Sequence, residues 1–339
     1  MPLTINTNIS SLIAQRNLNS ATNALNTSME RMTTGYRINH ASDNAAGYSI
    51  AKQWVTQLHS LDIVSDNTAT GSDMLTTAEE MYSLLTDHLQ RIRDLTEQAA
   101  NGTYGSASLR AIQAEAAARF QEISRISANA EFNGIKLMAF DTTEGADNSD
   151  VGMTESGLNI QVGLYANADS RIKLDIDLFK KASVSGLFSG MSGNPSESGK
   201  TFSEIIQSAG ATATTLDTET GIQAFAAACA GMKYTSDKKL VLQTDPDMTA
   251  RELLGFLDAA INDISDRVTK IGAAQNRLTS AISALDVQSQ NLTSSLSTLR
   301  DTDIASESSN YLQAQILQQA SSTLLSTANQ LPSVALNLI

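Results

Sequence analysis

The sequence is poor in charge, in aromatic side chains and in cysteine. Charged residues make up 17% of the 339 residues and aromatic residues 5%, so the interior must be built mainly from aliphatic side chains and alanine. That composition suits long packed helices better than a sandwich or an enzyme core. Cys229 is the single cysteine, which excludes an intrachain disulfide and leaves the redox compartment open.

Positive charge is scarce as well, because the formal net charge at pH 7 is −13. Nothing offsets the repulsion from phosphates, which argues against a nucleic-acid partner. The same imbalance disfavours binding to anionic membrane surfaces. It also keeps free monomers apart in solution, since like-charged copies repel each other.

Targeting segments are missing too. The first residues, MPLTINTNIS, lack the basic start and the apolar stretch of a secretory signal peptide, so we expect none. No run of 18 apolar residues occurs, so we expect no membrane-spanning segment. Composition alone therefore leaves a cytoplasmic location open.

The C-terminal third carries a heptad repeat that predicts a helix over residues 254–299. One register is apolar without a miss: Leu257, Ile264, Ile271, Leu278, Leu285, Leu292 and Leu299. The expected second register is apolar at five of seven positions: Leu254, Ile261, Val268, Gln275, Ile282, Ser289 and Leu296. Together they form one stripe that must meet another helix. The pattern Thr249-x-x-Glu252, after Pro246, predicts a capping box at the start.

Further elements follow from the same reasoning. A second long helix is predicted from the Asp43 cap to Asn101-Gly102, and a third from about Ser108 to Asn129. Residues 132–135 predict a tight turn between short strands, and residues 158–178 a second hairpin. In the second helix, one predicted inward register is Trp54, Leu61, Thr68, Leu75, Tyr82, Leu89 and Thr96.

The two ends of the chain are amphipathic but almost without charge. Residues 1–29 contain one charged side chain, Arg16, and residues 308–339 contain none. A helix faced with Ser, Thr, Asn and Gln suits burial inside an assembly, where no ion must be desolvated. Disordered tails are the alternative, and both interpretations hold if the ends order only on polymerisation. The apolar positions are Leu18, Leu25 and Met32 at one end and Leu312, Ile316 and Leu324, with Ala320 and Ala328, at the other.

Residues 179–247 differ in composition from the predicted helical segments on either side of them. Residues 183–200 hold four Gly and six Ser, which predicts a flexible surface link. Short helices are expected near 202–209 and 218–232. We therefore predict a small separate domain inserted between two halves of a helical rod.

Candidate chemical sites are weak in this sequence. Residues 193–201 (GNPSESGKT) resemble a phosphate-binding loop but have one residue too many between the glycines and no apolar strand before them. A solvated linker is the favoured interpretation. His40, His59 and His88 lie in no zinc-ligand spacing, which favours surface or interface positions.

Two further features have simple structural interpretations. Cys229 lies in an Ala-rich stretch and is predicted to be a small buried side chain rather than a nucleophile. Asp175 and Asp177 alternate along the second hairpin and are predicted to form the wet face of a strand.

Several motifs, in a fixed order, resemble the bacterial flagellins. Residues 30–39 (ERMTTGYRIN) are similar to the family's ERLSSGLRIN, and residues 40–47 (HASDNAAG) to NSAKDDAAG. Residues 272–278 (GAAQNRL) match GAxQNRL, and the end of the chain matches QA…ANQxP. The Phe132-Asn133-Gly134 motif also matches. Departures are small: Tyr36 for Leu, His40, and Asn44 for Asp. The resemblance covers about 1–178 and 248–339.

This resemblance implies a mainly α fold: a long antiparallel coiled-coil-like helical rod formed by the N- and C-terminal halves, with small β-hairpins and an inserted outer domain. It implies three parts. Residues 1–44 and 300–339 pair as an inner domain lining the filament core, residues 45–178 and 248–299 form the rod, and residues 179–247 are displayed on the surface. The side chains expected to carry assembly are Leu18, Leu25, Met32, Leu312, Ile316, Leu324 and Leu331.

The implied function is that of a structural subunit, not an enzyme, which polymerises with itself into the flagellar filament for swimming. The implied route is export through the flagellar type III apparatus to an extracellular location. The implied partners are an export chaperone and the cap and junction proteins, with no cofactor, no nucleic acid and no membrane insertion.

The resemblance also implies recognition by Toll-like receptor 5. The matching residues are Gln90, Arg91, Leu95 and Gln98, with Glu115 on the adjoining helix. Arg91 offers a forked donor set and Leu95 a small apolar anchor. Contacts between filament subunits are the alternative role for Arg91 and Arg93, and both roles are compatible.

Three other identities compete with this one. A hook-associated junction protein shares related end domains, but the ANQxP terminus favours the filament subunit. A protease embedded in the insert would need HExxH, which is absent. An intracellular coiled-coil scaffold would carry charged e and g positions and salt-bridged ends, which the charge-free ends contradict.

Overall fold

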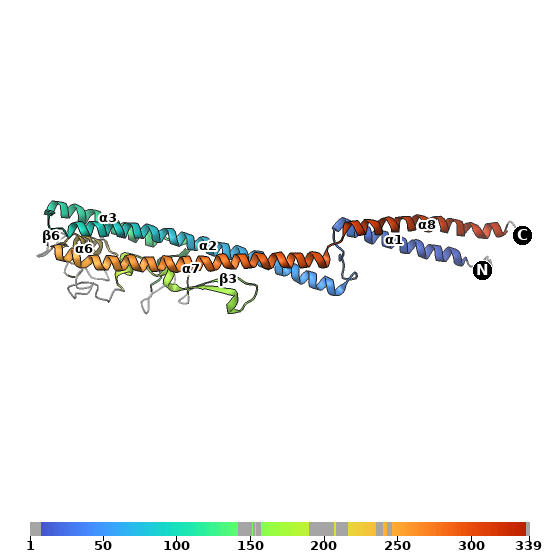
Figure 1. Ribbon diagram of the computed structural model, residues 1–339, viewed down its shortest axis with the longest axis horizontal. Coiled ribbons are helices and arrows are strands. Elements are labelled where there is room, and N and C mark those ends of the chain that lie inside the picture. The colour runs from blue at the N-terminus through green and yellow to red at the C-terminus, as the bar shows by residue number, and fades with distance from the viewer. Residues whose placement is uncertain are drawn as a thin grey trace. The chain divides into compact units, whose positions relative to one another are not determined.

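The computed structural model describes residues 8–141, 151, 153, 157–189, 207, 216–234, 240–242 and 246–336, without the side chains of 189, 234, 240–242, 246–249 and 331–336. These residues form mainly helices, as the sequence predicts (Figure 1). The α-helices are α1 (Ile9–Thr34), α2 (Ala45–Ala99), α3 (Ser106–Asn129), α4 (Val184–Ser189), α6 (Glu219–Cys229), α7 (Pro246–Arg300) and α8 (Ile304–Leu336).

The strands pair only as antiparallel neighbours within the described residues. The pairs are β1 (Glu131–Phe132) with β2 (Ile135–Lys136), β3 (Leu158–Gln161) with β4 (Arg171–Leu174), and β5 (Met232–Tyr234) with β6 (Leu240–Leu242). The tight turn predicted between the first pair is confirmed: Asn133 and Gly134 both have positive φ, the backbone geometry that such hairpin turns require.

The chain divides into two compact units. The first comprises residues 1–62 and 286–339, and the second residues 63–285. The helices α2 and α7 each contribute residues to both units.

In the second unit, α2 and α7 lie side by side and antiparallel (Figure 1). Cross-helix contacts run in opposite chain directions: Arg93 Nε bonds the Asp258 carboxylate at 2.5 Å, and Gln275 donates to Glu79 at 2.9 Å. The predicted inward register of α2 is confirmed. Trp54 is partly exposed, but the following six members are buried: Leu61, Thr68, Leu75, Tyr82, Leu89 and Thr96.

The predicted second register of α7 is confirmed only in part, since Leu296 is buried and Ile261 and Val268 pack against the core from its edge. Leu254, Ile261 and Val268 are only partly buried. The buried companions of Leu257, Ile264, Ile271 and Leu278 are instead Leu253, Ala260, Arg267 and Ala274, together with Phe256. The shift arises because α7 meets more than one helix: its buried face joins a core that also contains α3, α6 and residues 178–188.

Arg267 occupies a position where the pattern calls for an apolar side chain. Its Nη1 donates to the Lys180 carbonyl at 2.9 Å, and Nη2 pairs with Asp263 at 2.6 Å. The guanidinium also lies over the Tyr82 ring at 5.9 Å, and the Tyr82 hydroxyl donates to the Leu178 carbonyl at 2.8 Å. These contacts fix the 178–180 segment against both long helices.

The described part of the insert packs into the same core. Phe225 of α6 contacts Phe120 of α3, with ring centroids 4.5 Å apart, and Phe188 at 4.9 Å. Gln113 donates to Gln223 at 2.7 Å. The boundaries expected at residues 179 and 247 therefore do not coincide with a boundary between packing units, and the role of residues 179–247 as an outer domain stays a prediction. Of the predicted helix 202–209, only Gln207 is described.

Several predicted helix ends shift by a few residues. Asn44, not Asp43, caps α2, because its Oδ1 accepts from the Gly47 N–H at 2.9 Å. Asp43 instead accepts from the backbone N–H groups of His40 and Asn39, and the bond from His40 lowers the pKa of this carboxyl. The helix α7 begins at Pro246, a residue that favours a first helical turn, so Thr249-x-x-Glu252 lies inside the helix and not at its start.

Asp175 and Asp177 are exposed or partly exposed, but the strand predicted to carry them is wrong. The strand β4 ends at Leu174, and a short 3₁₀ helix follows over Ile176–Phe179. Asp175 caps that helix through a bond from the Asp177 N–H. The Asp177 carboxylate pairs with Lys180 at 2.6 Å, which lowers its pKa, and with Lys270 of α7 at 3.5 Å.

Asp217, just before α6, forms hydrogen bonds with Ser183 and Ser185 at the start of α4. Its carboxylate accepts from Ser183 Oγ at 3.0 Å and from the Ser185 N–H at 2.9 Å, and it pairs with Lys181 at 3.0 Å. Burial alone would raise the pKa of Asp217, but the bonds from Ser185 and Lys181 outweigh it and lower the pKa below 3.8.

We predict that Asp217→Asn lowers the free energy of unfolding of the monomer at pH 7 by about 1–3 kcal/mol, since the ion pair with Lys181 and the bond from Ser183 are lost, while the remaining amide oxygen can still accept from the Ser185 N–H. A carboxylate with a lowered folded pKa stabilises above its unfolded pKa, and that contribution disappears as the pH falls through the folded pKa. Denaturant titrations of the variant and wild type should therefore converge in acid. Asp73→Asn, an exposed carboxylate on α2, is the control, and a pH-independent gap would contradict the assignment.

Candidate functional site

In the first unit, α1 and α8 pack antiparallel along a seam of small side chains. Asn8 Nδ2 donates to the Ala328 carbonyl at 2.7 Å, and Ser11 Oγ to Asn329 Oδ1 at 2.7 Å. Buried residues recur every seven positions on both helices. They are Ala14, Ala21 and Ser28 on α1, and Glu307, Ala314, Ser321 and Ala328 on α8. Alanine and serine at these positions allow the two backbones to approach closely.

The predicted assembly residues separate into two groups. Leu18, Leu25 and Met32 flank the seam and are partly buried. The predicted residues of α8 point outward instead, and they belong to a larger set of apolar side chains that are 42–65% exposed. Leaving aside Ile304, the first residue of α8, which lies beside Asp301, Asp303 and Glu307, we call the other eight the outward apolar residues: Ile9, Leu12, Ile13, Met29, Leu312, Ile316, Leu317 and Leu324. Leu331 lies on α8, but its side chain is outside the described part.

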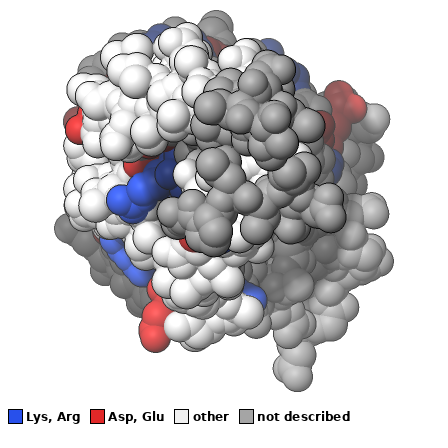
Figure 2. Space-filling model, turned by 90° about the vertical axis from the view of Figure 1, so that its right-hand side faces the viewer, with Lys and Arg blue, Asp and Glu red and all other residues white. Residues whose placement is uncertain are grey.

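Charge is almost absent around these residues. Along α1, Arg16 is the only charge before Glu30, and α8 has none after Glu307. Figure 2 looks onto the side where α1 and α8 lie in Figure 1, and most described atoms facing the viewer are uncharged. An exposed apolar surface of this kind marks an interaction site, because water is a poor neighbour for it.

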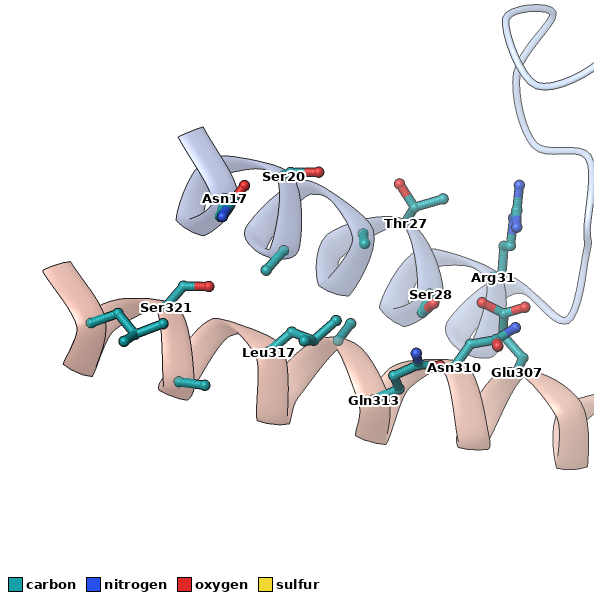
Figure 3. A pocket seen from close by; sticks show the side chains of 15 residues that line it. Asn17, Ser20, Thr27, Ser28, Arg31, Glu307, Asn310, Gln313, Leu317 and Ser321 are labelled. Atoms are coloured by element: carbon teal, nitrogen blue, oxygen red, sulfur yellow. The ribbon is translucent and has the colours of Figure 1, made fainter. Parts of the chain in front are cut away.

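A groove of 740 Å³ runs between the two helices (Figure 3). Its lining is uncharged except for Arg31 and Glu307. The Glu307 carboxylate points from α8 toward the part of α1 that carries Ser28 and Arg31. Amides, hydroxyls and alanines line most of the remaining length, and Leu317 and Leu324 connect it to the outward apolar residues.

The chain that connects α1 to the rest of this unit is fixed by cations. The helix α1 ends at Gly35, which has positive φ and donates its N–H to the Arg31 carbonyl at 2.9 Å. Arg37 donates to the Leu299 carbonyl at 2.7 Å. The Arg300 guanidinium lies 3.8 Å from the centre of the Tyr36 ring. These contacts hold the segment that follows α1 against the C-terminal end of α7.

The predicted receptor residues lie on α2 and α3 in the second unit. Arg91 Nε donates to Glu115 Oε1 at 2.8 Å, so the structure brings these two together. Gln90 and Gln98 are exposed. Leu95 is not an available anchor: its side chain is 2% exposed and lies in the core of the second unit. The spacing could have indicated this burial, because Leu95 lies three residues after the buried Ile92 and four before the buried Ala99.

The three histidines lie at or near the surface. His40 pairs with Glu30 at 2.9 Å, His59 is exposed, and His88 Nδ1 contacts Arg119 at 3.3 Å. Among the described residues, no three His, Cys, Asp or Glu side chains cluster as metal ligands would. The loop at 193–201 lies outside the described residues. No helix in the described ranges combines the length and apolarity needed to cross a membrane.

The predicted burial of Cys229 is confirmed. Its side chain is fully enclosed in α6, and burial raises the pKa of the thiol to about 12. A thiol of that pKa carries almost no thiolate at neutral pH and so cannot act as an efficient nucleophile.

Comparisons with known proteins agree with the motifs. The family model for the bacterial flagellin N-terminal helical region matches residues 5–143, and that for the bacterial flagellin C-terminal helical region matches residues 254–339. Flagellin D of Vibrio anguillarum and polar flagellin B/D of Vibrio parahaemolyticus are each 33% identical to the chain. Flagellin C of Vibrio cholerae is also 33% identical. Each alignment covers 100% of both proteins.

We predict that Cys229 of the folded monomer reacts with a thiol reagent only when α6 separates from the core in which it is buried. At pH 8 the labelling should be at least a hundredfold slower than in denaturant, because both enclosure and the raised pKa suppress the thiolate. Absorbance-monitored thiol titration measures this. Comparably fast labelling in the two states would show that α6 is not packed as described.

Proposed function

Because the chain belongs to the bacterial flagellins, and is thereby a structural subunit of the flagellar filament, we propose that the outward apolar residues of α1 and α8 form its assembly contacts. The observation that carries this assignment is the exposure of eight large apolar side chains on two helices that have almost no charge. A filament is the form in which other copies cover them, since a head-to-tail contact that does not close produces a helical fibre.

The energetics favour ordering on assembly. The seam within one chain fully buries only small apolar groups, worth ~0.8 kcal/mol for each methyl-sized unit. Burying the outward apolar residues between copies adds ~1.5–3 kcal/mol for each side chain. Ordering each helical residue costs about 1–2 kcal/mol of backbone entropy. The ends of a free monomer are therefore weakly held, and neighbouring copies complete their stabilisation.

The domain roles follow from the same assignment. Residues 1–44 and 300–339 form the inner domain that lines the filament core. Residues 45–178 and 248–299 form the helical rod, and residues 179–247 the surface-displayed part. The charge-free composition of the ends supports the inner role, because no ion has to lose its water there.

Export and the remaining partners are part of the proposal. The chain leaves the cell unfolded through the flagellar type III apparatus, with a dedicated chaperone, and joins the filament beside its cap and junction proteins. Terminal helices that are only weakly held within one chain suit both unfolded export and addition to the filament. The relatives named above are flagellins, which favours a filament subunit over a hook-associated junction protein.

The assembly assignment predicts that Ile316→Lys abolishes polymerisation, because a lysine in an apolar contact loses its hydration without a partner. The monomer should keep its helical circular dichroism, since Ile316 is exposed. Ile316→Val, which keeps an apolar side chain, is the matched control and should polymerise. The readout is the sedimented fraction and negative-stain imaging after seeding. Normal filaments from Ile316→Lys would contradict the assignment.

We also propose that the free monomer is bound by Toll-like receptor 5 through Arg91, with Gln90, Gln98 and Glu115 around it. The Arg91–Glu115 pair supports this, because it holds the guanidinium in one orientation on the joint surface of α2 and α3. Leu95 contributes indirectly, through the packing beneath Arg91.

On this assignment, Arg91→Ala should lower receptor signalling by the monomer at least tenfold, and Arg91→Lys should recover only part of it, because a lysine cannot form a forked pair. Arg110→Ala removes an exposed arginine of α3 and is the control. A reporter cell assay with monomer of verified fold gives the comparison. Equal signalling by Arg91→Ala and Arg110→Ala would overturn the receptor assignment.

A further inference from the structure

Glu307 is an unusual residue for the α1–α8 seam. It is 5% exposed, and its Oε1 atom has no hydrogen-bond partner among the residues that the structure describes. Arg31, across the groove on α1, likewise has an unpartnered buried Nε. A buried polar atom without a partner is rare, because its lost hydration is not replaced. Glu307 therefore needs an explanation that one copy of the chain does not supply.

The surrounding seam gives little information about register. Its buried residues repeat every seven positions with Ala or Ser, and Glu307 is the exception on α8. A neighbouring helix displaced by one heptad would meet nearly the same small and apolar groups. A single polar residue in an otherwise uniform seam is a known means of fixing register, since the wrong register leaves it unpaired. Glu307 holds that position here.

We propose that Glu307 Oε1 accepts a hydrogen bond from an uncharged amide or hydroxyl group of a neighbouring copy of this chain. The groove end formed by Glu307 and Arg31 then fixes the axial register of the packed terminal helices. This inference rests on the proposed assembly through α1 and α8, and it adds the group that selects one register among several similar ones.

The groove favours another copy as the occupant. Leu317 and Leu324 line it and are also outward apolar residues, so the groove continues the proposed assembly surface. The segments that copies bring to that surface, residues 1–29 and 308–339, are rich in Asn, Gln, Ser and Thr and hold Arg16 as their only charge. A neutral amide satisfies Oε1 without bringing a second charge beside Arg31. A bound cation would lie close to that guanidinium and be repelled by it.

The test compares Glu307→Leu, Glu307→Gln and Asp286→Asn, the last removing an exposed carboxylate of α7. Glu307→Leu should still polymerise, because the outward apolar residues are intact. Its filaments should depolymerise several degrees lower and show mixed axial spacings in helical reconstructions. Glu307→Gln keeps an acceptor oxygen and should retain a single spacing, and Asp286→Asn should match wild type.

Three results would overturn the inference. One is a Glu307→Leu filament with a single spacing and an unchanged depolymerisation temperature. Another is a loss of hydrogen-exchange protection at the α1 and α8 amides of the Glu307→Leu monomer, relative to the wild-type monomer, that is as large as the loss between the two filaments. That result would mean that Glu307 acts within one chain. The third is a depolymerisation temperature that depends on the identity of the added cation in wild type but not in Glu307→Leu.

Failure of the underlying assembly assignment gives a different result. In that case Ile316→Lys would polymerise normally, whatever the Glu307 variants do. If Ile316→Lys fails to polymerise while Glu307→Leu forms filaments identical to wild type, the assembly surface stands and only the register role of Glu307 is lost.

Discussion

The contact between α1 and α8 is the constraint on which the rest depends. It brings two backbones close through alanine and serine, and it leaves the larger apolar side chains about half exposed or more. A conventional leucine seam would have buried those side chains inside one copy and left a self-sufficient hairpin. The small-residue seam instead leaves large apolar side chains exposed on both helices. Membership of the flagellin family, the scarcity of charge at the chain ends and the outward apolar residues are all consistent with a subunit that packs against other copies.

The second unit supplies what the terminal helices lack. Its long helices bury aliphatic side chains in depth, and its surface carries many of the ion pairs, such as Arg93 with Asp258 and Arg91 with Glu115. That division separates two tasks. A folded body can remain soluble at −13 net charge, while the terminal helices carry a surface suited to other copies.

Periodicity predicted the long helices well, because the α2 register from Leu75 through Tyr82 to Leu89 faces one continuous core. It failed where more than two elements meet. The buried companion of Leu257 is Leu253 and not Leu254, since α7 must also cover α3 and the 178–188 segment. No local pattern indicates that Arg267 is buried, because its partners are the Tyr82 ring and a carbonyl far away in sequence. The outward direction of Ile316 depends on the choice of alanine at the seam, which apolar spacing alone does not distinguish.

The packing of α6 against α3 has a consequence for variation in length. Phe225 covers Phe120, and Cys229 and its alanine neighbours fill the space beside them. A graft that begins after Phe188 and ends before Asp217 would leave the contacts of both residues in place. A deletion that extends into α6 would open the core of the rod helices to water. For peptide display on a motile filament, the useful splice points are therefore set by this aromatic contact and not by the limits of the insert.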